Sequence, residues 1–300
     1  MGHEEDRLLI DRCLSALAHD HIGVRAWRTL AGSASGAAVY LVEGSGGDVV
    51  LKATTSEATA AGARRELNFY RALADDVPVR TPRVLGLHEE PGLSCLLLEV
   101  ALPPREAAAW SGEQWVEAAA QLGRLHHPAV VETSQDAPCR LGRRAAVEDG
   151  QVEQAASWWR QLGQERLALP WLERLDDVAA ALDGPPECLI HGDWHVGNLL
   201  RDPDGQALVW TDWQEVRLGH GPEDLALLWQ RAEFDGGTPP REAMLEAYAR
   251  ERGIPIDATF RRAIVAAELL ILLFGWPPWL LFVEPARREV LLGRMADFRL

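Results

Sequence analysis

The first hundred residues alternate between helical and strand-like spacing of apolar positions. Residues 5–18 carry leucine and isoleucine at helical spacing, and a second helix is predicted near residues 57–74. Five short runs rich in apolar and β-branched residues predict strands, near residues 24–30, 37–43, 48–54, 83–89 and 94–100. Together these elements predict a small α+β lobe built on a mainly antiparallel sheet.

From about residue 105 onward the spacing of apolar residues becomes helical. Helices are predicted at residues 111–126, 152–162, 171–182, 222–232, 239–251 and 258–274, and a final segment begins at residue 285. Residues 128–150 lack periodicity and predict a loop or an insertion. The larger part of the chain is therefore predicted to be mostly α-helical.

A stiff connector separates these two parts. The strand-like run 94–100 leads directly to Pro103 and Pro104, which are poor strand residues. We therefore predict two domains, residues 1–102 and 103–300, with residues 99–102 as the hinge.

Composition places the chain among ordered globular proteins. Hydrophobic residues make up 47% of the 300 positions, which suffices for a sizeable core. Residues 1–10 are acidic and lack the pattern of a secretory signal. The longest apolar stretch, residues 263–283, is interrupted by Glu268 and by Gly275-Trp276-Pro277-Pro278. It therefore predicts a buried helix that ends at a turn rather than a membrane span.

The cysteines indicate the cellular compartment, and the net charge limits the classes of binding partner. The four cysteines are scattered without the spacing of a metal site, which is typical of reduced thiols in a cytoplasmic protein. A formal net charge of −15 argues against a nucleic-acid partner. The charge is compatible with a cationic small substrate, although an acidic surface also serves solubility. We expect a cytoplasmic monomer or homodimer with no membrane partner.

The stretch 190–213, IHGDWHVGNLLRDPDGQALVWTDW, carries the strongest chemical pattern. Four residues separate Asp193 from Asn198, and Asp212 follows fourteen residues after Asn198. Phosphoryl transfer to a hydroxyl needs a carboxylate to orient the acceptor, and it needs hard oxygen ligands for Mg²⁺ beside the nucleotide phosphates. Asp193 fits the first role, and Asn198 and Asp212 fit the second.

A hairpin is predicted within this stretch. The DPDG sequence at residues 202–205 is typical of a turn between two short strands, at 198–200 and 207–210. Such a hairpin would bring Asn198 and Asp212 together in space.

The string HGDWHVGN, residues 191–198, resembles the HGDxxxxN catalytic loop of the aminoglycoside phosphotransferase family and its relatives among small-molecule kinases. In this resemblance, TDW at 211–213 stands where the family carries its metal-binding Asp motif. The pattern also resembles the protein-kinase set, but H-R-D, D-F-G and A-P-E are not present as written, and Gly192 favours the small-molecule branch. The resemblance implies a bilobal protein-kinase-like fold with an N-terminal nucleotide-binding lobe, ATP or alternatively GTP as the nucleotide, and Mg²⁺.

Lys52 supports this hypothesis from a different direction. It is the only lysine among the 30 basic residues, and it lies in the apolar strand-like run DVVLKAT. Where a single point charge must contact phosphate oxygens, a compact ammonium fits and a planar guanidinium does not replace it. Kinases pair such a lysine with a glutamate on the next helix. Glu66 is the expected partner, and Glu57 is the competitor.

The resemblance also implies two backbone sites for the nucleotide. The small-residue loop 31–36, AGSASG, would cover the phosphates, with Ser33, Ser35 and Gly36 placed to contact them. At the hinge, the Glu99 carbonyl and the Ala101 amide would meet the adenine edge.

Two further residues are predicted to support the catalytic loop. Asp224 lies in an Asp-Leu-Ala element that resembles the family's bracing aspartate, with a first-turn helix acid as the alternative. His191 is expected to brace rather than to act as an acid or base. His195 is expected to be an exposed loop residue, with zinc or base roles left open.

The resemblance implies transfer of the γ-phosphate to a hydroxyl of a small molecule. Aminoglycoside-type antibiotics and amino sugars are favoured. Choline, homoserine or ribose derivatives, and an inactive nucleotide-binding scaffold, are the alternatives. Acids and tryptophans of the C-terminal helices are the candidate acceptor-binding residues; these are Glu233, Asp235, Glu268, Trp229 and Trp276.

Overall fold

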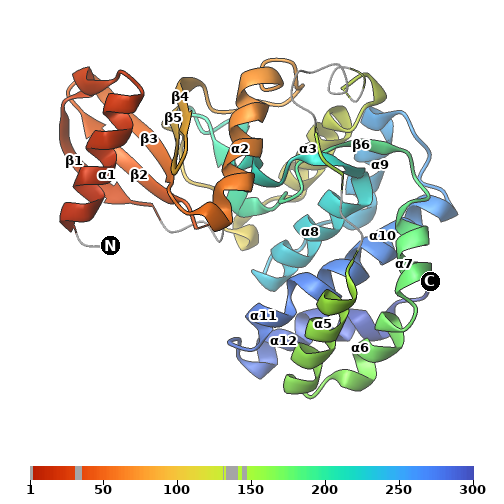
Figure 1. Ribbon diagram of the computed structural model, residues 1–300. Coiled ribbons are helices and arrows are strands. Elements are labelled where there is room, and N and C mark those ends of the chain that lie inside the picture. Colours follow the sequence, from red (N-terminus) through yellow and green to blue (C-terminus); the bar gives the residue numbers. More distant parts are fainter. Residues whose placement is uncertain (1–2, 31–35, 131, 133–140, 144–146) are drawn as a thin grey trace. The chain divides into compact units, whose positions relative to one another are not determined.

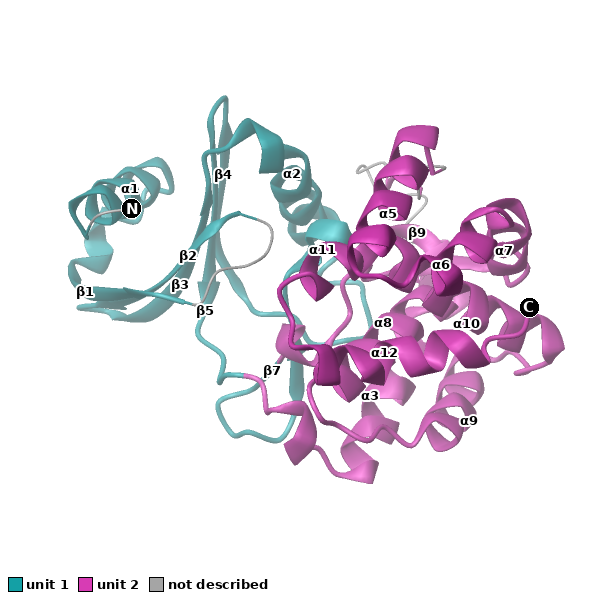
Figure 2. Cartoon of the chain, turned by 90° about the horizontal axis from the view of Figure 1, so that it is seen from below, with its two compact units in different colours: residues 1–103, 137–139, 200–216 teal, residues 104–136, 140–199, 217–300 magenta. Residues whose placement is uncertain are grey.

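The computed structural model describes residues 3–30, 36–130, 132, 141–143 and 147–300. Within these residues the contacts define two compact units, shown in Figure 2. The first unit contains residues 3–103 and 200–216, and the second contains most of the remainder. The first unit therefore includes a segment, residues 200–216, that follows about half of the second unit in the chain.

A five-stranded antiparallel sheet forms the centre of the first unit (Figure 1). The strands are β1 (Val24–Thr29), β2 (Ala38–Gly44), β3 (Gly47–Thr54), β4 (Val84–Glu90) and β5 (Leu93–Glu99). Their order is β1-β2-β3-β5-β4, and every neighbouring pair is antiparallel. The predicted α+β class and all five predicted strands are confirmed.

Two helices accompany this sheet, α1 (His3–Ala16) and α2 (Glu57–Ala72). Ile10 and Cys13 of α1 belong to a buried apolar cluster that also contains Leu51 of β3. Because successive side chains of a strand point to opposite faces, Lys52 lies on the face away from α1. That face carries α2, so the strand period delivers the lysine to the helix that follows it.

The predicted hairpin is present as β7 (Leu199–Arg201) and β8 (Leu208–Trp210), which form a two-stranded sheet. Asp202 organises its turn, since its carboxylate accepts hydrogen bonds from the amides of Gln206 and Ala207 at 2.8 and 3.2 Å. The prediction that Asn198 opens the first strand is wrong. Asn198 instead ends a short 3-10 turn, Val196–Asn198, where the loop bends before the strand.

The second unit is mostly helical, as predicted. Its helices are α3 (Gly112–Leu125), α5 (Asp149–Gln161), α6 (Glu165–Leu172), α7 (Leu175–Leu182), α8 (Gly221–Phe234), α9 (Arg241–Arg252), α10 (Ala258–Leu270), α11 (Pro277–Leu280) and α12 (Pro285–Asp297) (Figure 1). Side chains from α5, α10 and α12 share one buried apolar cluster, in which Trp159 is fully buried. Among the described residues, no helix is both long enough and apolar enough to cross a bilayer.

Two helix predictions need correction. Residues 171–182 do not form one helix, because α6 packs against α5 whereas α7 packs against α10, and the chain bends between them. The helix predicted to run to residue 274 is α-helical only to Leu270 and continues as a π-helical segment, Ile271–Gly275. Of the predicted loop at 128–150, residues 131, 133–140 and 144–146 lie outside the described residues. The loop prediction is wrong for residues 128–130 and 132, which are helical, and for residue 149, where α5 begins.

The sequence did not predict the short antiparallel pair that leads into the HGD string. Strands β6 (Glu187–Ile190) and β9 (Arg217–His220) pair from Glu187 with His220 to Ile190 with Arg217. Strand β6 ends where the HGD string begins, and β9 leads into α8. The motif therefore starts at the end of a strand, and the Asp-Leu-Ala element starts a helix next to it.

Candidate active site

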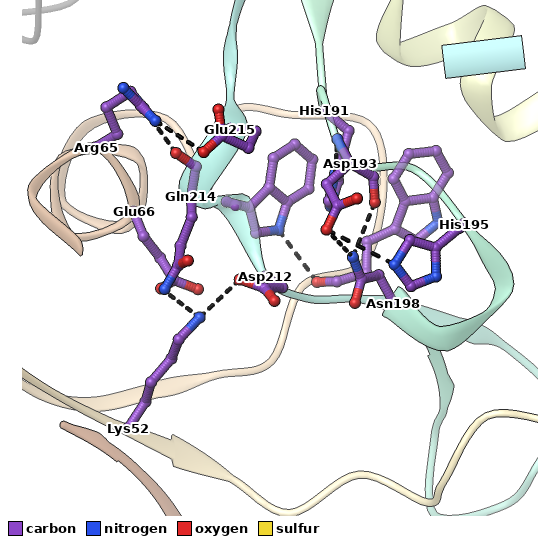
Figure 3. Close-up of polar contacts among 12 residues, drawn as sticks. Lys52, Arg65, Glu66, His191, Asp193, His195, Asn198, Asp212, Gln214 and Glu215 are labelled. Atoms are coloured by element: carbon purple, nitrogen blue, oxygen red, sulfur yellow. Dashed lines mark hydrogen bonds and ion pairs between the residues drawn. The ribbon is translucent and has the colours of Figure 1, made fainter. Parts of the chain in front are cut away.

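In the first unit, Lys52 lies between two carboxylates. Its Nζ atom is 2.8 Å from Oε2 of Glu66 on α2 and 2.7 Å from Oδ1 of Asp212 (Figure 3). Lys52 is only 8% exposed, which excludes a side chain that extends into solvent. The predicted ion pair with Glu66 is present, and Glu57 is not the partner.

The two acids keep this buried ammonium charged. Burial alone would lower the pKa of Lys52, but the charges of Glu66 and Asp212 outweigh it and raise the pKa above its ordinary value. Burial raises the pKa of Glu66 despite the attraction of Lys52. The group is therefore a fixed positive charge with carboxylates on two sides.

Asp212 has a left-handed backbone with φ 66°, which is uncommon for a residue other than glycine and costs roughly 1–2 kcal/mol. The turn that follows it packs on α2. Trp213 is fully buried and stacks on Phe69, with ring centroids 3.9 Å apart. Arg65 donates from Nε to the Gln214 carbonyl at 2.6 Å. Helix α2 thus supplies Glu66 and also holds the turn that aims Asp212.

The predicted nucleotide loop is only partly described. Ser33 and Ser35 lie outside the described residues. Gly36 has φ 72°, and a Cβ atom there would lie 3.2 Å from Cγ2 of Thr59. A left-handed conformation with little free space explains a glycine at this position. At the predicted hinge, Glu99 is the last residue of β5, and Ala101 follows in an irregular segment.

In the second unit, Asn198 holds Asp193. The Asn198 side chain donates from Nδ2 to the Asp193 backbone carbonyl at 2.8 Å and to Oδ2 of its carboxylate at 3.1 Å (Figure 3). Both amide hydrogens are therefore used on Asp193, so Oδ1 of Asn198 is the atom left to act as an oxygen ligand. Such an oxygen suits a hard cation such as Mg²⁺.

The carboxylate of Asp193 is strongly held in its anionic form. Burial would raise its pKa, but His195, His191 and Asn198 together lower the pKa to about 2. The expectation that His195 is an exposed loop residue is wrong. Its side chain is 16% exposed, and its Nε2 atom lies 3.6 Å from Oδ2 of Asp193.

The backbone of the HGD string is fixed by Asp224 of α8. One carboxylate oxygen of Asp224 accepts the amide hydrogen of His191 at 2.8 Å, and the other accepts that of Gly192 at 2.9 Å. His191 in turn accepts the Asp193 amide hydrogen at its Nδ1 atom, at 3.3 Å. These bonds fix three successive peptide groups of the loop.

A buried chain of polar side chains lies behind Asp224, and sequence reasoning missed it. His126 contacts Asp224 through Nε2 at 3.2 Å and the Tyr248 hydroxyl through Nδ1 at 2.9 Å. Arg252 donates to the same hydroxyl at 2.6 Å. These residues come from α9 and the end of α3, far from the motif in sequence. The only sequence signal was the spacing of Tyr248 within the predicted helix, which places it on the buried side.

The acidic acceptor candidates all have arginine partners. Glu268, 2% exposed, contacts Arg241 at 3.0 Å and Arg294 at 3.1 Å. Glu233 contacts the same two arginines at 2.8 and 2.9 Å. Asp235 contacts Arg287 at 3.0 Å. The two glutamates and their two arginines therefore cancel in charge.

The two tryptophan candidates are buried in the same helical region. Trp229 lies under the Arg241 guanidinium, which is 4.5 Å from the ring centroid. Trp276 donates from its indole nitrogen to Gln230 at 2.8 Å. Both rings are part of the packed interior of this unit.

Sequence comparison assigns most of the chain to one family model. The model described as the phosphotransferase enzyme family matches residues 13–264. This range includes Lys52, Asp193, Asn198, Asp212 and Asp224. None of the curated protein sequences is significantly similar to the chain.

Solved structures of several phosphotransferases share the fold. An aminoglycoside phosphotransferase from Streptomyces rimosus, solved with ADP and streptomycin, is 20% identical, with 88% of this chain and 98% of that chain covered and a TM-score of 0.55. A macrolide 2'-phosphotransferase from Brachybacterium faecium is 19% identical (97% and 99% covered, TM-score 0.56). A microcompartment-associated aminopropanol kinase is also 19% identical (97% and 94% covered, TM-score 0.65).

Proposed function

The chain belongs to the phosphotransferase enzyme family and is a small-molecule kinase, and we propose that it transfers the γ-phosphate of ATP to a hydroxyl of an aminoglycoside-type antibiotic or amino sugar. The observation that carries this proposal is the pairing of a buried lysine with Glu66 and Asp212 in one unit, and of Asp193 with Asn198 in the other. Residues 1–102 would serve as the nucleotide-binding lobe, and residues 103–300 would supply the catalytic loop and the acceptor site.

Lys52 would bind the α and β phosphates of the nucleotide. Its two carboxylate partners keep it charged and fix its position, so little reorganisation is needed when phosphate arrives. Gly36, with Ser33 and Ser35, would cover the phosphates through backbone amides. The Glu99 carbonyl and the Ala101 amide would bind the base.

Asn198 and Asp212 are the proposed ligands of Mg²⁺. The fit rests on donor chemistry, because each offers a hard oxygen and Asp212 is held in an uncommon backbone conformation. When bound, the metal would supply positive charge that neutralises the charge developing on the transferred phosphate.

Asp193 would orient the acceptor hydroxyl and accept its proton. A carboxylate with a pKa of about 2 is a weak base near neutral pH. Phosphoryl transfer has a loose transition state in most analyses, so the proton moves late and orientation matters more than basicity. His191 and Asp224 would act by fixing the backbone of Asp193.

The acceptor class is open to one specific alternative. The shared fold includes an aminopropanol kinase, and Glu233 and Glu268 are neutralised by Arg241 and Arg294 rather than left to meet several ammonium groups. A smaller amino alcohol or another hydroxylated metabolite, such as choline, homoserine or a ribose derivative, is therefore the second candidate.

An acceptor screen tests the proposal. Purified protein would be incubated with Mg²⁺ and ATP, or GTP, and with streptomycin, kanamycin, glucosamine, 1-amino-2-propanol, choline, homoserine or ribose. Nucleotide consumption would be followed, and the phosphorylated product identified by mass spectrometry. Turnover on an aminoglycoside or glucosamine supports the proposal. Turnover confined to the amino alcohols or ribose supports the alternative, and consumption without any phosphorylated product contradicts both.

A further inference from the structure

The imidazole of His195 is held in one tautomer. Its Nδ1 atom accepts the Gly197 amide hydrogen at 3.0 Å. A ring nitrogen that accepts a hydrogen bond carries no proton, so the hydrogen of the neutral ring is on Nε2. The backbone of the loop therefore determines which nitrogen of His195 is the donor.

That donor faces one oxygen of Asp193. Nε2 of His195 lies 3.6 Å from Oδ2, an electrostatic contact that is longer than a formed hydrogen bond. Asn198 donates to the same oxygen at 3.1 Å (Figure 3). Among the residues that the structure describes, no hydrogen bond reaches Oδ1 of Asp193. The two oxygens of the carboxylate therefore differ, with Oδ2 approached by two donors.

We propose that His195 is a positioning residue that, together with Asn198, holds Oδ2 of Asp193 so that Oδ1 is presented to the acceptor hydroxyl. This inference rests on the proposed function. One oxygen of the carboxylate is hydrogen-bonded to Asn198 and faces the Nε2–H of His195, so rotation about the Cβ–Cγ bond is restricted and the second oxygen keeps a fixed direction. Such preorganisation lowers the barrier to in-line transfer.

The low pKa of Asp193 supports orientation as the main contribution of this residue. His195 is among the neighbours that lower this pKa, and a lower pKa weakens the carboxylate as a base. A histidine beside a general base would therefore be unhelpful if basicity limited the rate. It is useful when the direction of the accepting oxygen limits the rate.

His195 also has a local structural role that the test must separate. It caps the short turn Val196–Asn198 through the bond to Gly197. Asparagine is a good cap, and its side-chain oxygen occupies about the position of Nδ1. The variant His195→Asn keeps the cap and removes the Nε2 donor. The variant His195→Gln keeps a donor and loses the cap, because its amide nitrogen reaches about the position of Nε2.

The chain offers a matched control in His127. Its Nδ1 atom accepts the Ala129 amide hydrogen at 3.3 Å, which is the same two-residue geometry, but its side chain is exposed and outside the candidate site. His127→Asn removes an imidazole from such a turn without touching Asp193. We expect wild-type kinetics from this variant.

Steady-state kinetics over the acceptor panel, with thermal unfolding of each variant, provide the test. We expect His195→Asn to lower kcat roughly 10- to 100-fold, the cost of a small misplacement at the reacting group, with the KM for ATP unchanged. His195→Gln should recover part of that loss. Wild-type kcat in folded His195→Asn would overturn the inference, because a capping role alone predicts this result.

A measurement on the wild-type protein separates this inference from the proposed function. Nitrogen-15 chemical shifts of the imidazole report the tautomer without any turnover. We expect the proton on Nε2 of His195, and a proton on Nδ1 of the neutral ring would overturn the inference. If the tautomer is as expected but the wild type phosphorylates no acceptor in the panel, the proposed function fails while the geometry of His195 stands.

Discussion

Individual side chains in this protein act through neighbours that fix them. Lys52 is charged because Glu66 and Asp212 flank it, and Asp193 is fixed because Asn198 and the loop backbone hold it. In both places one functional group contacts at least two partners. Removing a partner therefore changes geometry and charge together.

Replacing Lys52 with arginine tests the need for a compact ammonium. The guanidinium is wider and cannot occupy the space between two carboxylates 2.7 and 2.8 Å from Nζ. A lost hydrogen bond to a charged group is worth about 1.5–3 kcal/mol. We expect the KM for ATP to rise roughly 10- to 100-fold. The exposed Arg64→Lys change on α2 is the control, and equal KM values for the two variants would contradict the assignment of Lys52.

Replacing Asp193 with alanine tests the catalytic carboxylate. Loss of a positioned acid–base group lowers turnover by roughly 10²- to 10⁴-fold. Binding of ATP, followed by fluorescence or calorimetry, should stay close to wild type because Asp193 is assigned to the acceptor. Near-normal turnover in folded Asp193→Ala would remove the central assumption of the mechanism.

Helices and strands place these residues, and the sequence predicted such elements unevenly. The strands of the first unit were predictable, because a period of two and short turns mark each one. The pairing of Lys52 with Glu66 followed from the resemblance to kinases, which pair such a lysine with a glutamate on the next helix. The break between α6 and α7 was not predictable, because α7 turns away from α6 to pack on α10, which is distant in sequence.

The buried polar side chains behind Asp224 were also not predictable from the sequence. His126, Tyr248 and Arg252 come from helices whose sequences give only an apolar period. No local motif marks a histidine at a helix end as a partner of a distant aspartate. Motif residues were found because their spacing is local, whereas these contacts depend on tertiary packing.

His126 predicts a pH dependence of stability. Burial lowers its pKa in the folded state, although Asp224 opposes the effect. The unfolded chain binds the proton first, below about pH 6.5, so the free energy of unfolding decreases as pH falls through this value. The limiting slope is about 1.4 kcal/mol per pH unit for one proton. The lowered pKa of Asp224 places its own loss of stability at more acidic pH.

Denaturant unfolding of wild type and His126→Gln between pH 8 and pH 5 measures this effect. Glutamine retains a donor toward Asp224 but does not titrate. We expect the difference in unfolding free energy between the two proteins to shrink as pH falls. Parallel curves would show that His126 does not stay neutral in the folded protein.

Gly221, the first residue of α8, tests how tightly the buried chain is packed. A Cβ atom on Gly221 would overlap the Tyr248 hydroxyl and lie 2.6 Å from a guanidinium nitrogen of Arg252. We expect Gly221→Ala to destabilise the protein by about 1–3 kcal/mol, as overpacking does. Gly112→Ala in the first turn of α3 meets nothing within 4 Å and should be neutral or slightly stabilising. A neutral Gly221→Ala would contradict the packing.

At the scale of the whole molecule, the proposed nucleotide and metal should stabilise the folded state. A ligand at 100 times its Kd adds about 2.7 kcal/mol to the unfolding free energy. We expect ATP with Mg²⁺ to raise the Tm, and EDTA to remove most of that rise. Asp212→Asn should retain less of the metal-dependent part than wild type. A rise in Tm by ATP that EDTA leaves unchanged would contradict the role of Asp212.

Because the chain has a single lysine, Lys52, a lysine-specific protease can cut it at only one place. An endoproteinase that cuts only after lysine has a single target bond in all 300 residues, and that bond lies inside β3, hydrogen-bonded to β2 and β5. Cleavage must wait until the central strand opens. The rate at which two fragments appear therefore measures the opening of the five-stranded sheet, with no label attached to the protein.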